Sequence, residues 1–478
     1  MSLQSSEVME SLNLFQGRNI QDAVDKEYMV EYRPSEQITD ASAPVIFNIP
    51  KQSRDFTDLR KCRMKMRLQI VHKDDTPLRS EEEVAFTNMI HQTAWAEVNV
   101  ALNGVPISNR SSSLYPYKAL FKTLMRHNEG SEDPSMRSMG WFPPYTGSAG
   151  LLGAGKPWEY AKQLCSESRV MELEGPMMED IFESERYLVN GVAIQIKLER
   201  CSDSFIRIQP FHHMIGVVTT EDIASRLKQK EDAKADWLAH PEDEEKKQRA
   251  ILRSSFYYQT LGDSKGYKVV LKDIVMKIAY VRVFPNVIQA VQDQIQQTPA
   301  LYPITRTDMK TVSIPAGQQQ VYFDTLFNGP RPKKIVMAFV SSEAVNGTID
   351  TDPLRFGHHF VSDVGIMVDG TLIQPKKLKY SDNHLSESVS TFTDYVQMVK
   401  ASGYGAPNVT PEAFARQPIY TFALDPELND ALQQQIVKGS ISIIVHFDRP
   451  LEKSVNIVMY AEMPGIVKID AARNAVMN

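Results

Sequence analysis

Hydrophobic residues recur along this chain mainly in short runs, in which apolar and polar positions alternate or apolar positions are continuous. Runs of this kind, bounded by Gly, Pro, Asn and Asp, are typical of β-strands. The clearest predicted strands are 63–71, 96–102, 192–199, 270–284, 333–340, 364–370, 441–447 and 455–462. Helical spacing is confined to 117–127, 221–239, 287–297 and 390–400. Many strands with long connections favour a β-sandwich or barrel over an enzyme of alternating strands and helices.

The strand pattern of the first half is repeated in the second half. VNVALNGVPIS (98–108) aligns with VGIMVDGTLIQ (364–374), and each is an alternating strand that runs into Asn-Gly or Asp-Gly, a tight-turn dipeptide. In both halves a helical segment follows this turn. Three further pairs align in the same order: 64–71 with 333–340, 170–176 with 421–426, and 191–200 with 439–449. Any two β-rich halves share strand-like matches, but a common order predicts an internal duplication.

A last aligned pair, 274–280 with 456–462, locates an insertion in the first half. These two segments are much closer in sequence than the other pairs, so the first half carries extra residues between its last two strands. The insertion covers about 205–265 and includes a long stretch of mixed-sign charge. We therefore expect a solvated helical excursion that contributes nothing to the core.

Composition and charge exclude several classes of protein. With 478 residues, of which 42% are hydrophobic and 23% charged, the chain is an ordinary soluble sequence long enough for two or three domains. The net charge of −6 disfavours a dedicated nucleic-acid-binding module but leaves room for a local basic face. We expect neither a membrane span nor a secretory signal, because no apolar run approaches about 20 residues and the first residues lack basic and apolar blocks.

The stretch GLLGAGKP (150–157) has the Gly-x4-Gly-Lys spacing of a nucleotide-binding loop. Such a loop needs a Ser or Thr hydroxyl after the Lys to hold magnesium, and a strand before it. Here Pro157 follows Lys156 and offers neither a hydroxyl nor an N–H. We therefore read 150–157 as a surface loop in the long connection of the first half, with Pro157 and Trp158 fixing its exit.

Other candidate sites receive little support from the sequence. His212-His213 and His358-His359 are adjacent pairs, and neighbours in a strand point to opposite faces, so each pair supplies at most one metal ligand. A G-x-S-x-G nucleophile elbow is missing from the sequence. The remaining candidates are interpreted as ordinary structure. The acidic residues Glu174, Glu179, Asp180 and Glu183 are expected in a solvated loop between strands. The three cysteines, Cys62, Cys165 and Cys201, are expected to be core thiols in a reducing compartment, and the glycosylation sequon at Asn346 is expected to stay unmodified.

Several blocks of the sequence together carry a family resemblance. They are EYMVEYRPSEQITDASAPVIFNIP, WAEVNVALNGVPIS with YPYKALFKTLM, ESERYLVNGVAIQIKLERCSDSF, YPITRTDMKTVSIPAGQQQ, VDGTLIQP and NIVMYAEMPGIVKIDAARN. In their order they resemble the major capsid proteins of polinton (Maverick) elements and adintoviruses. The resemblance spans nearly the whole chain apart from the insertion and loops. It implies a mainly β, double jelly-roll fold, with two antiparallel β-sandwiches fused in one chain.

The resemblance also implies a domain plan and a role. We expect an N-terminal arm (1–27), a first jelly-roll (28–285), a helical linker (286–298), a second jelly-roll (299–470) and a C-terminal tail (471–478). The implied role is that of a viral capsid protein, not an enzyme, that forms pseudo-hexagonal homotrimers tiling an icosahedral shell in the virion. Its partners would be further copies, a penton or minor capsid protein and packaged DNA, without catalytic residues, cofactor or metal. The alternatives are a carbohydrate-binding or cupin-like β-sandwich, or a minor or penton capsid protein.

Overall fold

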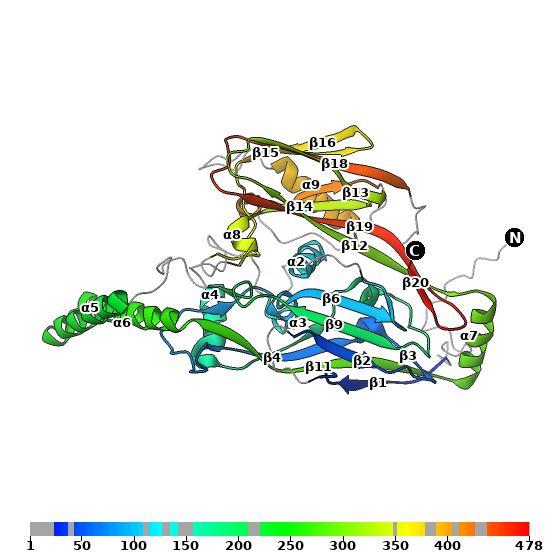
Figure 1. Cartoon of the computed structure of the whole chain (residues 1–478), viewed down its shortest axis with the longest axis horizontal. Coiled ribbons are helices and arrows are strands. Elements are labelled where there is room, and N and C mark those ends of the chain that lie inside the picture. The colour runs from blue at the N-terminus through cyan, green and yellow to red at the C-terminus, as the bar shows by residue number, and fades with distance from the viewer. Residues whose placement is uncertain are drawn as a thin grey trace, which may run out of the picture.

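The computed structural model describes residues 23–36, 43–108, 114–126, 134–141, 156–208, 220–347, 351–377, 389–403, 411–425 and 437–477. In this part of the chain two antiparallel β-sandwiches lie one above the other (Figure 1). The segment that connects them in sequence is helix α7 (Pro285–Gln297). Its start at Pro285 agrees with the preference of proline for the first helical turn.

The first sandwich consists of two facing sheets. One sheet has the order β1 (Val24–Tyr32), β11 (Tyr267–Val283), β4 (Arg63–His72) and β8 (Met171–Pro176), with β3 (Asp55–Thr57) also paired to β11. The other has the order β2 (Val45–Ile49), β9 (Ile194–Arg200), β6 (Trp95–Leu102) and β7 (Val105–Pro106). A small ribbon joins β5 (Ala85–Phe86) to β10 (Arg207–Ile208).

The second sandwich repeats this arrangement. One sheet has the order β12 (Ala300–Ile314), β19 (Val455–Ile469), β14 (Lys334–Ser341) and β17 (Tyr420–Ala423), with β20 (Ala475–Met477) also paired to β19. The other has the order β13 (Gln320–Pro330), β18 (Lys438–Phe447), β15 (Val361–Val368) and β16 (Thr371–Lys377). Read in chain order, the strands occupy matching places in both sandwiches.

This match confirms the duplication predicted from the sequence, because every aligned pair of segments falls on matching strands: β4 with β14, β6–β7 with β15–β16, β8 with β17, β9 with β18, and β11 with β19. The two predicted tight turns also form. Asn103 and Gly104 have φ of 47° and 82°, and Asp369 and Gly370 have φ of 49° and 81°. Positive φ at both central residues is the hairpin turn that Asn-Gly and Asp-Gly favour.

The predicted helices are confirmed with small shifts at their ends. Helix α2 (Tyr115–Arg126) follows the β6–β7 hairpin and helix α9 (Val389–Ala401) follows the β15–β16 hairpin, so each sandwich has a helix in the same slot. Shorter helices are α1 (Ile90–Thr93), α3 (Pro134–Arg137), α4 (Lys156–Cys165), α8 (Ser342–Val345) and α10 (Pro411–Arg416). No helix in the described ranges combines the length and apolar character needed to cross a bilayer.

The insertion forms a helical hairpin of α5 (Thr220–Ala239) and α6 (Glu244–Lys265), which projects from one end of the first sandwich (Figure 1). Its helical, exposed character agrees with the sequence, but the expectation that it contributes nothing to the core is wrong at its two ends. Ile206 and Gln259 are fully buried. Gln259 donates to Tyr267 Oη at 3.0 Å, which fixes the base of α6 to β11. Both ends of the insertion therefore belong to the core of the first sandwich.

Both expected terminal segments contain a strand. β1 begins at Val24, within the expected arm, and its backbone pairs with β11. β20 lies within the expected tail and pairs with β19. The sequence signal for both edge strands is weak, because β1 opens with three consecutive charged residues after Val24 and β20 has only three residues.

The hydrophobic core extends across both sandwiches. The interior of the second sandwich forms one cluster, which includes Ile335, Met337 and Phe339 of β14. The alternate residues of the same strand, Val336, Ala338 and Val340, are also fully buried, but they belong to the core cluster of the first sandwich. Because side chains of a strand alternate between faces, the sheet β12-β19-β14-β17 is covered on both sides.

Candidate functional site

Among the described residues, buried charged and aromatic side chains gather at the contact between the two sandwiches. We call this contact the junction. It consists of α2 and the short helix η4 (Asp180–Glu183) of the first sandwich, packed on the outer face of the sheet β12-β19-β14-β17. Figure 1 shows α2 between the two sandwiches. Every residue of α2 from Tyr115 to Met125 is buried. An amphipathic surface helix would expose one face, so α2 is covered by both bodies.

Aromatic side chains form the apolar part of the junction. The ring of Phe121 stacks on Phe356, with centroids 5.3 Å apart, and lies 5.8 Å from the ring of Tyr460. Two tyrosine hydroxyls cross the junction as donors, Tyr117 Oη to the carbonyl of Pro353 and Tyr395 Oη to the carbonyl of Leu124, both at 2.8 Å. Stacked rings and satisfied hydroxyls fix the sandwiches in one relative position.

A buried cluster of charges lies beside these rings. Lys118 Nζ is 3.0 Å from both Glu179 Oε1 and Asp180 Oδ1. Lys122 Nζ is 2.8 Å from Asp180 Oδ1 and from Glu183 Oε1. Arg126 Nη1 is 2.6 Å from Glu183. The three cations therefore face three carboxylates, and removing any one charge would leave its partners uncompensated inside the protein.

Asp180 extends this cluster to the second sandwich. Its Oδ2 accepts the backbone N–H of Thr307 on β12 at 2.8 Å, and its Oδ1 accepts the Thr307 hydroxyl at 3.0 Å. Burial alone would raise the pKa of Asp180, but Lys118 and Lys122 outweigh it and hold this pKa well below its usual range. Asp180 is therefore ionised and locks the position of β12 against η4.

The pKa of Glu179 is shifted in the opposite direction to that of its neighbour, Asp180. Burial raises the pKa of Glu179 to about 7, because Lys118 offsets the burial only in part and the charge of Asp180 raises it further. Near Tyr117 of α2, burial raises the pKa of Asp352 to about 6. The junction therefore holds two carboxyl groups that take up protons in mildly acidic solution.

The second sandwich contributes an ion pair of its own to the junction. Lys334 Nζ is 2.8 Å from Glu462 Oε2, and it also donates to Ser402 Oγ at 3.2 Å. Tyr460 Oη donates to the other oxygen of Glu462. Burial alone would raise the pKa of Glu462, but Lys334 keeps it below its usual value. Lys334 is only 2% exposed, so this pair is part of the core and not of the surface.

The turn before β20 ties the far end of the second sandwich to the first. Arg473 Nη2 donates to Asn190 Oδ1 at 3.0 Å, and Asn103 Nδ2 donates to the carbonyl of Arg473 at 2.7 Å. Gly191 has φ of 79°, and a Cβ there would come within 3.3 Å of the Arg473 side chain. A glycine at this position allows the close approach.

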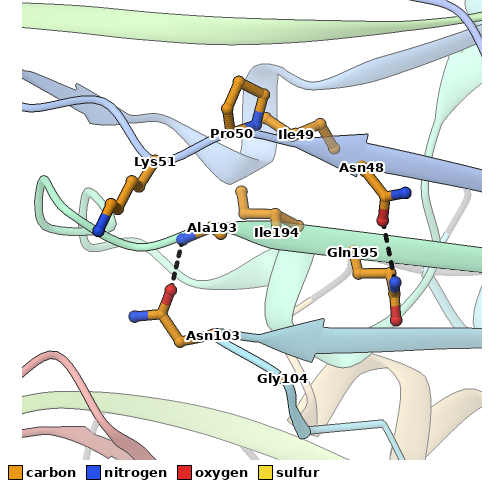
Figure 2. A pocket seen from close by; sticks show the side chains of 9 residues that line it. All are labelled: Asn48, Ile49, Pro50, Lys51, Asn103, Gly104, Ala193, Ile194 and Gln195. Atoms are coloured by element: carbon orange, nitrogen blue, oxygen red, sulfur yellow. Dashed lines mark hydrogen bonds between the residues drawn. The ribbon is translucent and has the colours of Figure 1, made fainter. Parts of the chain in front are cut away.

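A shallow groove of about 590 Å³ lies near this turn, at the ends of β2 and β9. Its lining consists of Asn48, Ile49, Pro50, Lys51, Asn103, Gly104, Ala193, Ile194 and Gln195. Figure 2 shows the amides engaged within the groove: Gln195 Nε2 donates to Asn48 Oδ1 at 2.9 Å, and Asn103 Oδ1 accepts the N–H of Ala193 at 2.8 Å. These bonds occupy much of the hydrogen-bonding capacity that a polar ligand would need.

The structure corrects one expectation about the acidic residues. Glu179 and Asp180 were expected in a solvated loop, but they are 3% and 6% exposed. Their partners, Lys118 and Lys122, lie four residues apart on α2 and so share one face. The sequence contains this signal, since two lysines interrupt the apolar run YKALFKTLM, but it does not show which carboxylates they meet.

The structure also corrects two expectations about local conformation. Lys156 and Pro157 begin helix α4, so the end of the stretch 150–157 is helical and not a loop, while 150–155 lie outside the described residues. His358 and His359 precede β15 in a turn, with φ of 46° at His359, so they are not strand neighbours. Burial lowers the pKa of both histidines to about 4.

The remaining candidates fall into three groups. Cys62 and Cys165 are buried and Cys201 is half-buried, and burial raises the pKa of each thiol to about 12. His212, His213 and the end of the sequon at Asn346 lie outside the described residues. Among the residues that are described, there is no group of three or more His, Cys, Asp or Glu side chains placed to hold a metal ion.

Comparison with solved structures decides the fold. A chain of the Sputnik virophage structure superimposes on 100% of this chain and 92% of its own length, with a TM-score of 0.55 and 10% identity. A chain of the PBCV-1 virus capsid matches with a TM-score of 0.52 over 97% of this chain and 98% of its own, at 10% identity. The major capsid protein of Faustovirus matches with 0.51 over 95% and 92%, at 8% identity. The fold is a double jelly-roll.

Comparison of sequences is less informative than comparison of structures. No family model matches the chain. An uncharacterised protein of Caenorhabditis elegans is 26% identical over 188 residues, which cover 37% of this chain and 43% of that protein. The chain thus matches less than half the length of this relative. The double jelly-roll expected from the sequence is confirmed by the structural matches.

Proposed function

We propose that this chain is a viral major capsid protein that assembles as pseudo-hexagonal homotrimers and tiles an icosahedral shell in the virion. The observation that carries the proposal is the repetition of one sandwich, with the same strand order, twice in a single chain. Three such chains around a threefold axis present six similar lobes, and a hexagonal outline tiles a facet. The proteins that share the fold are named as virus capsid chains.

The junction supports this role because a shell subunit must hold its two lobes at a constant angle. Three features oppose a hinge: the stacked rings around Phe121, the buried charge cluster at Asp180, and the contact of Arg473 with Asn190. Opening the junction would expose the outer face of the sheet β12-β19-β14-β17, with Val336, Ala338 and Val340, to water. The cost of exposing core side chains, about 25 cal/mol per Å² of apolar surface, favours a rigid unit.

The proposal assigns a structural role without catalytic chemistry. Its partners are other copies of the chain, a penton or minor capsid protein at the vertices, and packaged DNA through non-specific contacts. Assembly would take place inside the host cell. Trimer interfaces that hold without covalent links need to bury well over about 1,000 Å² each.

Light scattering of the purified protein tests the proposal. We expect the mass of a trimer, unchanged by reducing agent, and sheets or shells in electron micrographs of concentrated protein. A monomer at high concentration in ordinary salt would contradict the capsid role. It would favour a carbohydrate-binding or cupin-like sandwich, and glycan binding lost in Gln195→Ala would then place the ligand in the groove of Figure 2.

Micrographs also separate the two capsid roles. A major capsid protein gives threefold particles with a hexagonal outline, whereas a penton protein gives fivefold rings. A fivefold ring has no need of two fused sandwiches.

A further inference from the structure

The projecting hairpin rests at its base on a buried polar cluster, which we call the latch. Its members are His72 at the end of β4, Glu82 in the connection after β4, Gln259 on α6 and Tyr267 at the start of β11. Each of them is at most 3% exposed. Because these side chains are withdrawn from water, their polar atoms depend on nearby protein groups for hydrogen bonds.

Both ring nitrogens of His72 face oxygen atoms. Nδ1 lies 3.3 Å from the carbonyl oxygen of Gly266, and Nε2 lies 3.2 Å from Glu82 Oε1. A neutral imidazole has one N–H and can donate to only one of two acceptors. Both bonds therefore form together only when His72 and Glu82 hold one proton more than a neutral histidine and an ionised glutamate.

This additional proton has the same effect on either side chain. On His72 it makes an imidazolium that donates to both oxygens. On Glu82 it makes a carboxylic acid that donates to Nε2, while Nδ1 donates to Gly266. The other contacts of Glu82 fix its position against the ring, because Oε1 accepts the backbone N–H of Arg79 at 2.9 Å and Oε2 accepts the hydroxyl of Tyr267 at 3.1 Å.

The latch contacts the backbone of α6 directly. Gly266 caps the C-terminus of this helix, so the bond from His72 Nδ1 ends on the cap. Gly262 of α6 is buried, and a Cβ at this position would overlap Glu82 Oε2. Gln259 adds a third contact, since it donates to Tyr267 Oη at 3.0 Å and accepts the backbone N–H that follows Glu82. The base of the helix is thus packed against the pair of His72 and Glu82.

We infer that the proton shared by His72 and Glu82 fastens the hairpin of α5 and α6 to β4, so that the base of α6 is held at low pH and released as pH rises. Loss of the proton leaves one of the two oxygens facing the ring without a donor. Opening the base lets water reach both side chains. Because the closed hairpin binds the proton and the open one releases it, rising pH favours the open form.

The charged groups on the elements around the latch make contacts of their own. The surface ion pairs are Lys265 with Asp74 at 3.0 Å, Lys268 with Asp75 at 2.7 Å, and Lys162 with Glu83 at 2.8 Å. The guanidinium of Arg79 lies 4.7 Å from the centre of the Tyr258 ring. Asp263 accepts from Gln259 at 2.9 Å and from Tyr267 at 3.2 Å. Burial, reinforced by the charges of Asp263 and Glu82, raises the pKa of Tyr267 far above its usual value, so its hydroxyl keeps its proton.

Hydrogen exchange of the full-length protein, measured by mass spectrometry, tests the inference. Exchange is followed at the base of α6 (255–266) from about pH 5.5 to about pH 9, on both sides of the range in which a free imidazole loses its proton. Each rate is divided by that of an unstructured peptide at the same pH and compared with α2 in the same sample. The variants are His72→Gln and Glu82→Gln. Glu83→Gln is the matched control, because its side chain pairs with Lys162 outside the latch.

We expect protection at the base of α6, relative to α2, to fall at least about tenfold over this pH range in the wild type and in Glu83→Gln. In His72→Gln and Glu82→Gln the fall should be no more than about twofold, because neither variant has a pair that shares a proton. Folded His72→Gln and Glu82→Gln chains that keep the wild-type dependence on pH overturn the inference. A wild-type chain whose protection does not change with pH also overturns it.

Nuclear magnetic resonance of the wild-type chain, with histidine labelled by the heavy nitrogen isotope, locates the proton without any substitution. The His72 ring is identified by its contact with the ring of Tyr267, whose centre is 5.2 Å away. At low pH we expect a proton on both nitrogens, or on Nδ1 alone beside a protonated Glu82. A ring protonated on Nε2 alone overturns the inference, because Nδ1 would then face the carbonyl of Gly266 without a proton.

Discussion

Replacing Asp180 by asparagine perturbs the junction at its most connected point. Asp180 accepts from Lys118, Lys122 and twice from Thr307, at distances of 2.8 to 3.0 Å. Asparagine supplies one accepting oxygen and an amide NH2, which is itself a donor. Whichever way the amide turns, its NH2 faces an ammonium group or the Thr307 N–H. The substitution therefore removes one buried negative charge and leaves at least one donor facing a donor.

The expected cost follows from two opposing effects. Breaking a buried ion pair by removing one partner costs about 3–5 kcal/mol. Part of this cost is recovered at Glu179, because its pKa falls once the charge of Asp180 is removed. Each pKa unit corresponds to about 1.4 kcal/mol. We expect a net loss of about 2–4 kcal/mol in the free energy of unfolding. For a large domain this lowers the melting temperature by roughly 5–10 °C.

Chemical denaturation in urea, followed by circular dichroism, measures this loss directly. Glu172→Gln is the matched control, because the Glu172 side chain is 54% exposed and forms an ion pair with Lys65 on the surface. Loss of this pair should lower the free energy of unfolding by less than about 1 kcal/mol. Thr307→Val removes only the hydroxyl that donates to Asp180 across the junction and leaves the charge cluster unchanged. The free energy of unfolding should fall by about 1 kcal/mol. If Asp180→Asn unfolds within about 0.5 kcal/mol of wild type, the charge cluster does not hold the junction and the argument from its geometry is wrong.

Four further outcomes are expected. Folding raises the pKa of Glu179 and Asp352 above their ordinary values, so the folded chain holds protons that the unfolded chain has released. The free energy of unfolding should therefore fall as pH rises from about 4 to about 7. The same series of unfolding measurements on Glu179→Gln should show a weaker decline. Replacing 222–252 with a Gly-Ser linker should change the melting temperature by no more than about 3 °C, because Gln259 still fixes the base of α6; a collapse of the fold would refute this. Calorimetric titration with ATP and magnesium should show no binding to wild type or to Lys156→Ala, and micromolar binding would refute this. The buried thiols, such as Cys62, should react with a thiol reagent only on unfolding, and fast reaction of the native protein would contradict their burial.

The sequence predicts the fold well because a strand needs only local information. Alternation at 63–71 and at 441–447 marks which residues face a core, and the Asn-Gly and Asp-Gly turns set the hairpins that follow. The order of these elements in both halves then indicates the duplication. Each of these signals lies within about ten residues of chain, so no knowledge of long-range contacts is needed.

The junction is predicted far less well, because it depends on contacts between distant residues. The acidic run before β9 has the composition of a solvated loop, and only Lys118 and Lys122, some 60 residues away, turn it into part of the core. Likewise Val336 and Ile335 are both apolar, so the run at 333–340 does not show that its two faces pack on different bodies. Burial on both faces removes the alternation that would reveal an outer face.

The double covering of β14 and β19 has a consequence for how the two halves exist apart. A fragment that begins after α7 would present Val336, Ala338, Val340 and Tyr460 to water on an otherwise complete sandwich. Such a face is an aggregation site, so the second half depends on the first as a folding partner, although both descend from one pattern. During synthesis the first sandwich leaves the ribosome earlier, so α2 is already in the chain when the sheet that it covers is made. The repeated halves are therefore no longer interchangeable modules, because the outer face of this sheet is apolar in the second half and carries Arg63, Lys65 and Arg67 in the first.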